Sequence, residues 1–304
     1  MRHTRTLRRG LVPLLAAGVV ALTLAGAAYA ADGVTNGSFE TGDLTGWTTA
    51  AGPGGSVSVL AGGAPGGGSF FAHLFPDGQD VYTTLSQTFT ATAGDQLTGW
   101  ANFFDEEFAQ NQPCVFADEG IVEIVNPDAS VSQVFFAKHC VTGVGNNAST
   151  GWVSWSYIFP ATGTYTVQGR LANIGDSAVP STLDVDAVTY VDNTAPTASC
   201  ELGPNPSGKN EPNANAGFRT VTAADNVGVT SLVITGGTFT SGELASGDNV
   251  KLTFAPGSAG SDVRPGPGVL KAHITTNGQP FLVATDAAGN STSVPCGPLP
   301  PKGK

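Results

Sequence analysis

The sequence predicts an all-β protein built from two β-sandwiches in tandem, the second smaller than the first. Its 304 residues include 41 Gly and 20 Pro but only one Met, a composition typical of many short strands joined by tight turns. Several segments alternate apolar and polar residues with a period of two, as half-buried strands do. The chain without its leader is about 270 residues long, which favours two domains.

Residues 1–30 are predicted to form a secretory signal peptide. Four arginines lie within the first nine residues, an apolar run extends over 11–24, and small residues end the segment at Ala28-Tyr29-Ala30. A membrane-spanning helix is the alternative, but it needs about twenty apolar residues, and Pro13 interrupts this run. We therefore expect a secreted, extracellular protein without membrane insertion.

The exported chain is strongly acidic. The whole sequence has 13 Lys and Arg against 24 Asp and Glu, and the leader contains four of the arginines and no acidic residue, so the net charge moves from −11 to −15. Nucleic acids and anionic lipid surfaces both require a basic surface. The charge therefore argues against these partners and is compatible with cation binding.

The first domain is expected over residues 31–192, with two sheets facing each other. Its strand candidates are residues 57–60, 69–75, 81–90, 96–104, 120–125, 130–139, 152–159, 164–172 and 183–191. The stretch from Val34 to Trp47 is interpreted as the opening strand. In the closing strand, 183–191, the alternation predicts Leu183 and Ala187 on one face and Asp184 and Asp186 on the other.

The two ends of this domain carry a resemblance to a known family. An Asn-Gly-Ser-Phe-Glu sequence at 36–40 and a last strand with Asp followed by apolar residues resemble galactose-binding-like jelly-roll carbohydrate-binding modules. The resemblance implies a jelly-roll sandwich and, as partner, a polysaccharide or cell-surface glycan. It does not specify the sugar.

Four large side chains on the more polar parity of their strands are the candidate ligand-binding residues. Trp100 and Trp152 offer flat rings that stack on sugar C–H faces, while Gln168 and Arg170 offer forked hydrogen bonds to hydroxyls. The alternative is that both rings pack beneath loops. Trp47 and Trp155 are expected in the core.

A structural calcium ion is the predicted cofactor. The resembled modules often hold calcium between their first and last strands, and Glu40 and Asp186 are at the corresponding positions. Calcium prefers six to eight oxygen ligands. Ala187 follows Asp186 where a second acidic residue is common, so plain solvated strand-edge carboxylates are the alternative.

No catalytic site is predicted. An acidic cluster, Asp105, Glu106 and Glu107 with Asp118 and Glu119, is compatible with glycosidic acid–base chemistry or a second cation site, but a solvated loop is the favoured interpretation. The histidines after the leader, at positions 73, 139 and 273, occur without a nucleophile motif, so each is expected to be an ordinary strand residue.

The second domain is expected over residues 198–304, after a stiff linker at 193–197 that contains Pro196. Its strand candidates are residues 218–223, 231–235, 251–254, 270–275 and 281–285. The phrases Asp-Asn-Val-Gly-Val at 225–229 and Ala-Thr-Asp-Ala-Ala-Gly-Asn at 284–290 resemble bacterial immunoglobulin-like repeats of extracellular proteins. That resemblance implies a spacer or adhesion module.

Four cysteines in an exported chain predict two disulfides. Of the three connectivities, one keeps both bridges within domains, namely Cys114–Cys140 and Cys200–Cys296. A cysteine metal site is disfavoured because no Cys-x-x-Cys spacing occurs.

The sequence thus predicts a secreted, non-catalytic protein that recognises carbohydrate through its first domain and uses the second as a spacer. A structural or adhesive extracellular protein that binds no sugar is the alternative. A glycan-cleaving enzyme, using Glu106 and Glu107, is a third and less favoured interpretation.

Overall fold

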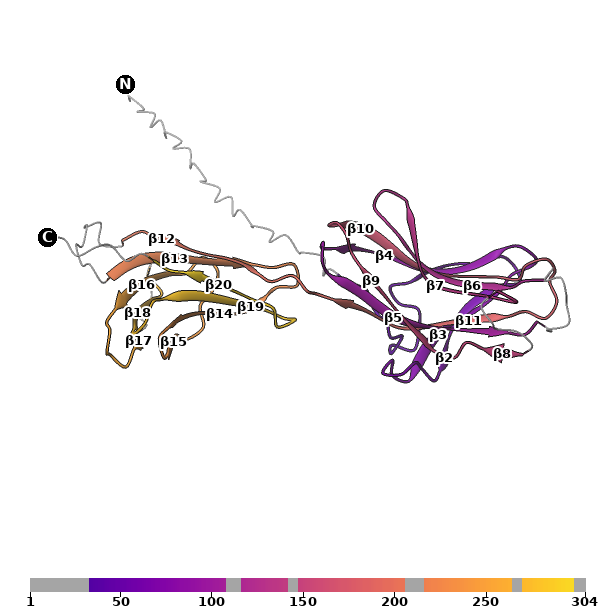
Figure 1. Ribbon diagram of the computed structural model, residues 1–304, viewed down its shortest axis with the longest axis horizontal. Coiled ribbons are helices and arrows are strands. Elements are labelled where there is room, and N and C mark those ends of the chain that lie inside the picture. The colour runs from indigo at the N-terminus through magenta and orange to yellow at the C-terminus, as the bar shows by residue number, and fades with distance from the viewer. Residues whose placement is uncertain (1–32, 108–115, 142–146, 206–215, 264–269, 298–304) are drawn as a thin grey trace, which may run out of the picture.

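The computed structural model describes residues 33–107, 116–141, 147–205, 216–263 and 270–297. The predicted signal peptide lies outside these residues. Every regular element within them is a β-strand, so the predicted all-β class is confirmed. Figure 1 shows two sandwiches lying end to end, joined by a single extended connection. In the described part of the chain no helix is long and apolar enough to cross a membrane.

The N-terminal sandwich consists of two antiparallel sheets. Sheet A has the order β1-β4-β10-β6-β7, with bounds Thr48–Ala50, Tyr82–Ala91, Gly163–Ala172, Glu119–Val125 and Val131–Lys138. Sheet B has the order β2-β3-β11-β5-β8, and β9 also pairs with β5; the bounds are Ser56–Ala61, Phe70–Phe75, Thr182–Val191, Gln96–Asp105, Ala148–Ser149 and Val153–Ile158.

The core between these sheets follows from the period-two pattern of the strands. In β5 every second residue from Leu97 to Asp105 is buried, and in β10 Tyr165 begins a buried series of the same period. Trp155 is 5% exposed, and Trp47 packs partly buried against the same core, as predicted. The sequence pattern therefore located most of the first domain's strands to within one or two residues.

Two predictions about the ends of this sandwich are wrong. Residues 34–47 form turns and not a strand, and the first strand begins at Thr48. Asn36 and Phe39 have φ angles of 50° and 56°, which lie in the left-handed region and are incompatible with an extended strand. The alternation in β11 also breaks: its pairing with β5 shifts register between Asp186 and Thr189, and Ala187 has φ 50°. Val188 is consequently the buried apolar residue there.

The C-terminal sandwich is smaller. Sheet C has the order β12-β13-β16-β18-β17, with bounds Thr197–Leu202, Ala216–Ala224, Asn249–Phe254, Ala272–Thr276 and Ser261–Val263. Sheet D has the order β15-β14-β19-β20, with bounds Phe239–Thr240, Val229–Gly236, Phe281–Asp286 and Ser291–Pro295. A separate buried cluster, which includes Val221, Ile234 and Leu252, forms its core. Its kinship with immunoglobulin-like repeats stays a prediction.

The structure contains the predicted disulfide Cys200–Cys296, which links β12 to the residue that follows β20 across 96 positions. Cys140 is also disulfide-bonded. Cys114, its predicted partner, lies outside the described residues, so that pairing stays a prediction.

Candidate functional site

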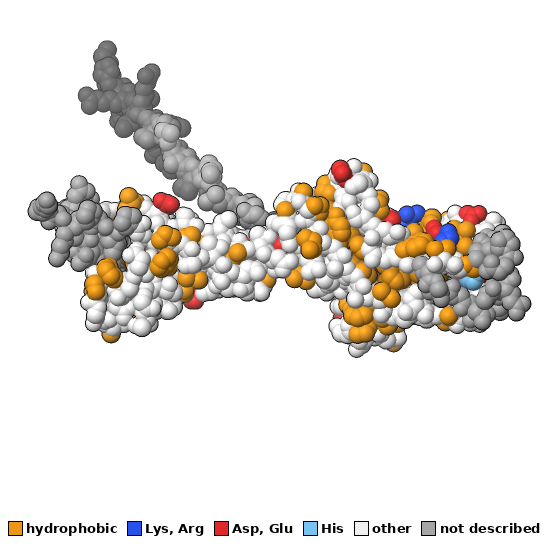
Figure 2. Space-filling model, in the orientation of Figure 1, with side chains coloured by type: hydrophobic (Ala, Val, Ile, Leu, Met, Phe, Trp, Pro, Cys, Tyr) orange, Lys and Arg blue, Asp and Glu red, His pale blue; other side chains and the backbone are white. Residues whose placement is uncertain are grey.

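The outer face of sheet A presents three cross-strand rows of side chains on neighbouring strands β4, β10, β6 and β7. The registers of these strands align Tyr82, Ala172, Glu119 and Lys138 in the first row, Thr84, Arg170, Ile121 and Phe136 in the second, and Ser86, Gln168, Glu123 and Gln133 in the third. Figure 2 shows positive and negative side chains together over this part of the molecule. These rows define the A-face.

Glu119 is the centre of one hydrogen-bond network on the A-face. Its Oε2 accepts a hydrogen bond from Lys138 Nζ at 2.8 Å, and its Oε1 accepts one from the Tyr82 hydroxyl. Burial alone would raise the pKa of Glu119, but these hydrogen bonds and the nearby positive charges outweigh it and lower the pKa. Burial and the Glu119 carboxylate raise the pKa of Tyr82 to about 12. Tyr82 is therefore a neutral hydroxyl donor.

Glu123 is the centre of a second network. Its Oε1 accepts hydrogen bonds from Arg170 Nη1 at 3.0 Å and from the Gln168 amide. The Arg170 guanidinium also lies over the Tyr82 ring, 4.0 Å from the centroid, which connects the two networks. Side chains of Arg170 and Lys138 keep 29% and 27% of their area exposed. The A-face therefore offers a planar guanidinium and an ammonium group that are held by ion pairs and still reach solvent.

The chemistry of the A-face suits a neutral, hydroxyl-rich ligand. Its charges are paired, so a strongly charged ligand would have to displace an internal ion pair. Amide, guanidinium and carboxylate groups each offer two parallel bonds to adjacent hydroxyls. The half-buried ring of Phe136 beside Ile121 adds an apolar surface next to them.

The four predicted ligand-binding residues do not form one site. Gln168 and Arg170 lie on the A-face, whereas Trp100 projects from the outer face of sheet B, opposite Asp186 in the pairing of β5 with β11. Trp152 packs against Phe71 of sheet B, with ring centroids 5.7 Å apart. Strand parity distinguishes core from surface but does not show which sheet a strand joins. Tyr82, Glu123 and Lys138 were not predicted, although their outward parity was the available signal.

The outer face of sheet B has its own polar row beside these rings. His73 Nδ1 and Asp184 Oδ1 are 2.7 Å apart, and Asn102 Nδ2 donates to Asp184 Oδ2 at 3.1 Å. The Ser149 hydroxyl donates in turn to Asn102 Oδ1 at 2.5 Å. Together with Trp100 and Trp152, this row gives sheet B a second surface with polar and aromatic groups. It is the surface against which ligand binding to the A-face is to be compared.

The predicted calcium ligands Glu40 and Asp186 do lie at the same loop, residues 62–69. Glu40 Oε1 accepts hydrogen bonds from the amides of Ser69 and Phe70 at 2.7 and 2.9 Å, and Asp186 Oδ2 accepts one from Ala64 N at 2.8 Å. Asp186 is fully buried, so the alternative of a solvated strand-edge carboxylate is wrong for this residue, although Glu40 is exposed.

Glycines let this loop approach the two carboxylates. A Cβ at Gly67 would collide with the Asp186 carboxyl group, and one at Gly68 with that of Glu40. Burial raises the pKa of Asp186, and the Glu40 charge adds to the shift. Carboxylate oxygens are ligands that calcium prefers, whereas the groups that hydrogen-bond to these two carboxylates are backbone N–H groups. Calcium binding here stays a prediction.

The acidic cluster is mostly buried, so its interpretation as a solvated loop is wrong. Asp105 and Asp118 are fully buried, Glu107 is 2% exposed, and His139 Nδ1 lies 2.7 Å from Asp105 Oδ2. Burial and the charge of Asp118 raise the pKa of Glu107 to about 7. Glu119 is not part of this group, because it faces outward from sheet A. Most of the predicted loop, residues 108–113, lies outside the described residues.

Comparisons with known proteins identify carbohydrate-binding modules among the solved structures with a similar fold. No protein-family model matches the sequence, and no curated protein matches it. A CBM61 module solved with β-1,4-galactotriose is similar at 14% identity and a TM-score of 0.35, over 51% of this chain and 94% of that one. The CBM22-1 xylan-binding domain of Paenibacillus barcinonensis Xyn10C matches at 14% identity and a TM-score of 0.29, over 50% and 88%.

A bacterial adhesin domain is similar to about the same degree. The K3 cleaved adhesin domain of Lys-gingipain from Porphyromonas gingivalis W83 matches at 14% identity and a TM-score of 0.33, over 52% of this chain and 96% of that one. Similarity at this level does not identify a ligand for this chain.

Proposed function

We propose that the protein is a secreted, non-catalytic carbohydrate-binding protein that holds a polysaccharide or cell-surface glycan against the A-face. The observation that carries this proposal is the pair of joined networks in which Glu119 and Glu123 orient Tyr82, Lys138, Arg170 and Gln168. Groups fixed before binding lose little conformational entropy when a ligand docks. The leader sequence and the disulfide support an extracellular location.

The physical logic is hydrogen-bond matching on a flat surface. A sugar presents neighbouring hydroxyls that each donate and accept. The A-face places donors on β4, β10 and β7 and carboxylate acceptors on β6, at the spacing of a sheet. The C-terminal sandwich serves as a spacer in this proposal.

A structural or adhesive protein without sugar binding is the second candidate. It is favoured by one observation, namely that the carboxylates of the A-face already have protein partners, which stabilise the sheet without any ligand. The two candidates differ in one measurable property, the retention of glycans.

The test is a glycan array probed with residues 31–304, followed by calorimetric titration of each glycan retained. The variants Gln168→Ala and Arg170→Ala are expected to weaken binding at least tenfold, on the order of 1.4 kcal/mol for each lost interaction. Trp100→Ala and Trp152→Ala are the matched controls on sheet B, and melting curves establish that each variant is folded.

Three outcomes decide the matter. Loss of binding in the Gln168 and Arg170 variants alone supports the A-face. Loss in the Trp100 or Trp152 variants alone moves the site to sheet B and contradicts the assignment made here. Absence of retention on every glycan contradicts carbohydrate binding and leaves the structural or adhesive role.

A further inference from the structure

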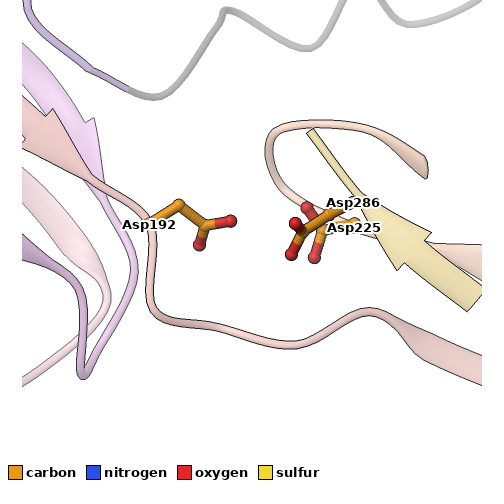
Figure 3. Close-up of side chains that lie close together, drawn as sticks. All are labelled: Asp192, Asp225 and Asp286. Atoms are coloured by element: carbon orange, nitrogen blue, oxygen red, sulfur yellow. The ribbon is translucent and has the colours of Figure 1, made fainter. Parts of the chain in front are cut away.

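Three carboxylates meet where the two sandwiches join. Asp192 follows the last strand of the N-terminal sandwich, Asp225 follows β13, and Asp286 ends β19. One oxygen of each carboxylate lies within 4.8 Å of the corresponding oxygen of the other two. Figure 3 shows Asp225 and Asp286 side by side, facing Asp192 across the junction. Three segments distant in sequence thus bring their charges to one point.

Asp286 has a buried carboxylate oxygen without a hydrogen-bond donor among the described residues. It is 2% exposed, and its Oδ1 accepts a hydrogen bond from Asn290 N at 2.8 Å. Its Oδ2 is buried and accepts no hydrogen bond from any group of the described residues. A buried carboxylate oxygen without a donor strongly disfavours the ionised form unless a positive charge compensates it. Asp192, 7% exposed, is almost as buried.

More negative charge surrounds the three carboxylates. Asp95 lies beside the cluster, since Asn226 Nδ2 donates to both Asp95 Oδ2 and Asp192 Oδ1 at 3.1 and 3.4 Å. Among the described residues, no ion pair includes any of these four aspartates. Asn226 Oδ1 is another buried oxygen without a hydrogen-bond partner there.

From this geometry we infer a divalent-cation site, of a kind suited to calcium, formed by Asp192, Asp225 and Asp286 at the junction of the two sandwiches. Two oxygens bound to one calcium at about 2.4 Å can be at most about 4.8 Å apart, and each of the three pairs of carboxylate oxygens here meets that limit. The donors are oxygens only, without sulfur or imidazole, which favours calcium over zinc or copper. Asp225 is half-buried and leaves the site open to solvent.

The site has a structural consequence that a surface cation site would lack. Asp192 belongs to the connection between the sandwiches, whereas Asp225 and Asp286 belong to the C-terminal sandwich. An ion shared by these groups fixes the direction in which the connection leaves the first sandwich. The inference stands independently of the proposed carbohydrate binding.

The test is a calorimetric titration of residues 31–304, freed of metal by a chelator and dialysis, with calcium chloride. The wild-type protein is expected to bind calcium saturably, and the isosteric variants Asp286→Asn and Asp225→Asn to bind at this site at least tenfold more weakly. Asp186→Asn, at the other predicted calcium position, and Glu201→Gln, an exposed acid on β12, are the matched controls and should keep this binding.

Small-angle scattering supplies the second measurement. Calcium should narrow the distribution of intramolecular distances in the wild type and in Asp186→Asn, but not in Asp286→Asn. The inference is overturned if wild type shows no saturable binding up to about 10 mM calcium, above the range of weak extracellular sites. It is equally overturned if Asp225→Asn and Asp286→Asn bind as tightly as wild type. Should Asp286→Asn fail to fold, the half-buried Asp225 position decides alone.

Discussion

Asn290 donates its side-chain amide across the junction between the two sandwiches to the main-chain oxygen of Asp192, at 3.1 Å. The same amide lies 3.3 Å from Asp192 Oδ2 and 3.5 Å from the main-chain oxygen of Thr194. On the other side of the connection, Asn193 N donates to Asp95 Oδ1 at 2.9 Å. Hydrogen bonds from both sandwiches therefore hold the connection in place.

Replacing Asn290 by alanine should loosen this connection. The variant loses the amide that donates to Asp192 and Thr194. This loss should lower the free energy needed to open the connection locally by an amount on the order of 1 to 2 kcal/mol. Limited proteolysis with proteinase K is expected to cleave the connection several-fold faster than in wild type, because cleavage requires local opening.

Asn277→Ala is the matched control for that experiment. Asn277 also bridges loops, since its amide donates to Thr238 Oγ1 and to the main-chain oxygen of Ser258 at 2.8 and 3.0 Å, but all its partners belong to the C-terminal sandwich. It should lower the stability of that sandwich and leave cleavage at the connection unchanged. Equal cleavage rates in Asn290→Ala and wild type would contradict the role assigned to Asn290.

The sequence predicted the positions of the strands well, but it did not show which strands pair with each other. Alternation is a local property, so Trp155 was placed in the core correctly. The turns at Asn36 and Phe39 require left-handed backbone at non-glycine residues, which no alternation pattern reveals. The bulge after Asp186 depends on pairing with β5, a partner about ninety residues away in sequence.

The candidate sites depend on the same long-range pairings. Arg170 and Trp100 share outward parity but belong to different sheets, which only the strand order decides. His139 lies beside Asp105 although 34 positions separate them, so the sequence left the burial of the acidic cluster undetected. Asp225 and Asp286 occur in the phrases that suggested immunoglobulin-like repeats, yet their meeting with Asp192 requires both sandwiches.

Removing the disulfide should affect one sandwich only. The double variant Cys200→Ser with Cys296→Ser opens a loop of 96 positions. In the chain-entropy model the disulfide that closes such a loop contributes about 4 to 5 kcal/mol to the free energy of unfolding. All four tryptophans lie between positions 47 and 155, so their fluorescence reports the N-terminal sandwich alone. We expect circular dichroism to show an earlier urea transition, while the fluorescence midpoint stays unchanged. A parallel shift of both signals would contradict independent unfolding.

Glu107 should make the N-terminal sandwich less stable as the pH rises. Its pKa is raised from 4.5 to about 7 in the folded state, mainly by burial, so the folded protein retains a proton that the unfolded chain has already lost. The contribution to stability is complete below about pH 4.5 and declines as the pH rises through 7, by up to about 3 kcal/mol.

Glu107→Gln removes this titration and should be more stable than wild type at pH 8 and similar to it at pH 4.5. The measurement is the urea midpoint by tryptophan fluorescence as a function of pH. If the urea midpoint changes with pH by the same amount in the wild type and in Glu107→Gln, then Glu107 ionises normally and the prediction is wrong.

Calcium should stabilise the N-terminal sandwich through Glu40 and Asp186. An ion held there would bind the folded state only, and at a hundredfold excess over Kd it would stabilise the N-terminal sandwich by about 2.7 kcal/mol. For a domain of this size the midpoint should rise by several degrees. Tryptophan fluorescence isolates this transition from any effect at the domain junction. Asp186→Asn should abolish the gain, and Asp286→Asn should retain it. If calcium and chelator give the same fluorescence melting curve for the wild type, the two carboxylates serve only to clamp loop 62–69 through the amides of Ala64, Ser69 and Phe70.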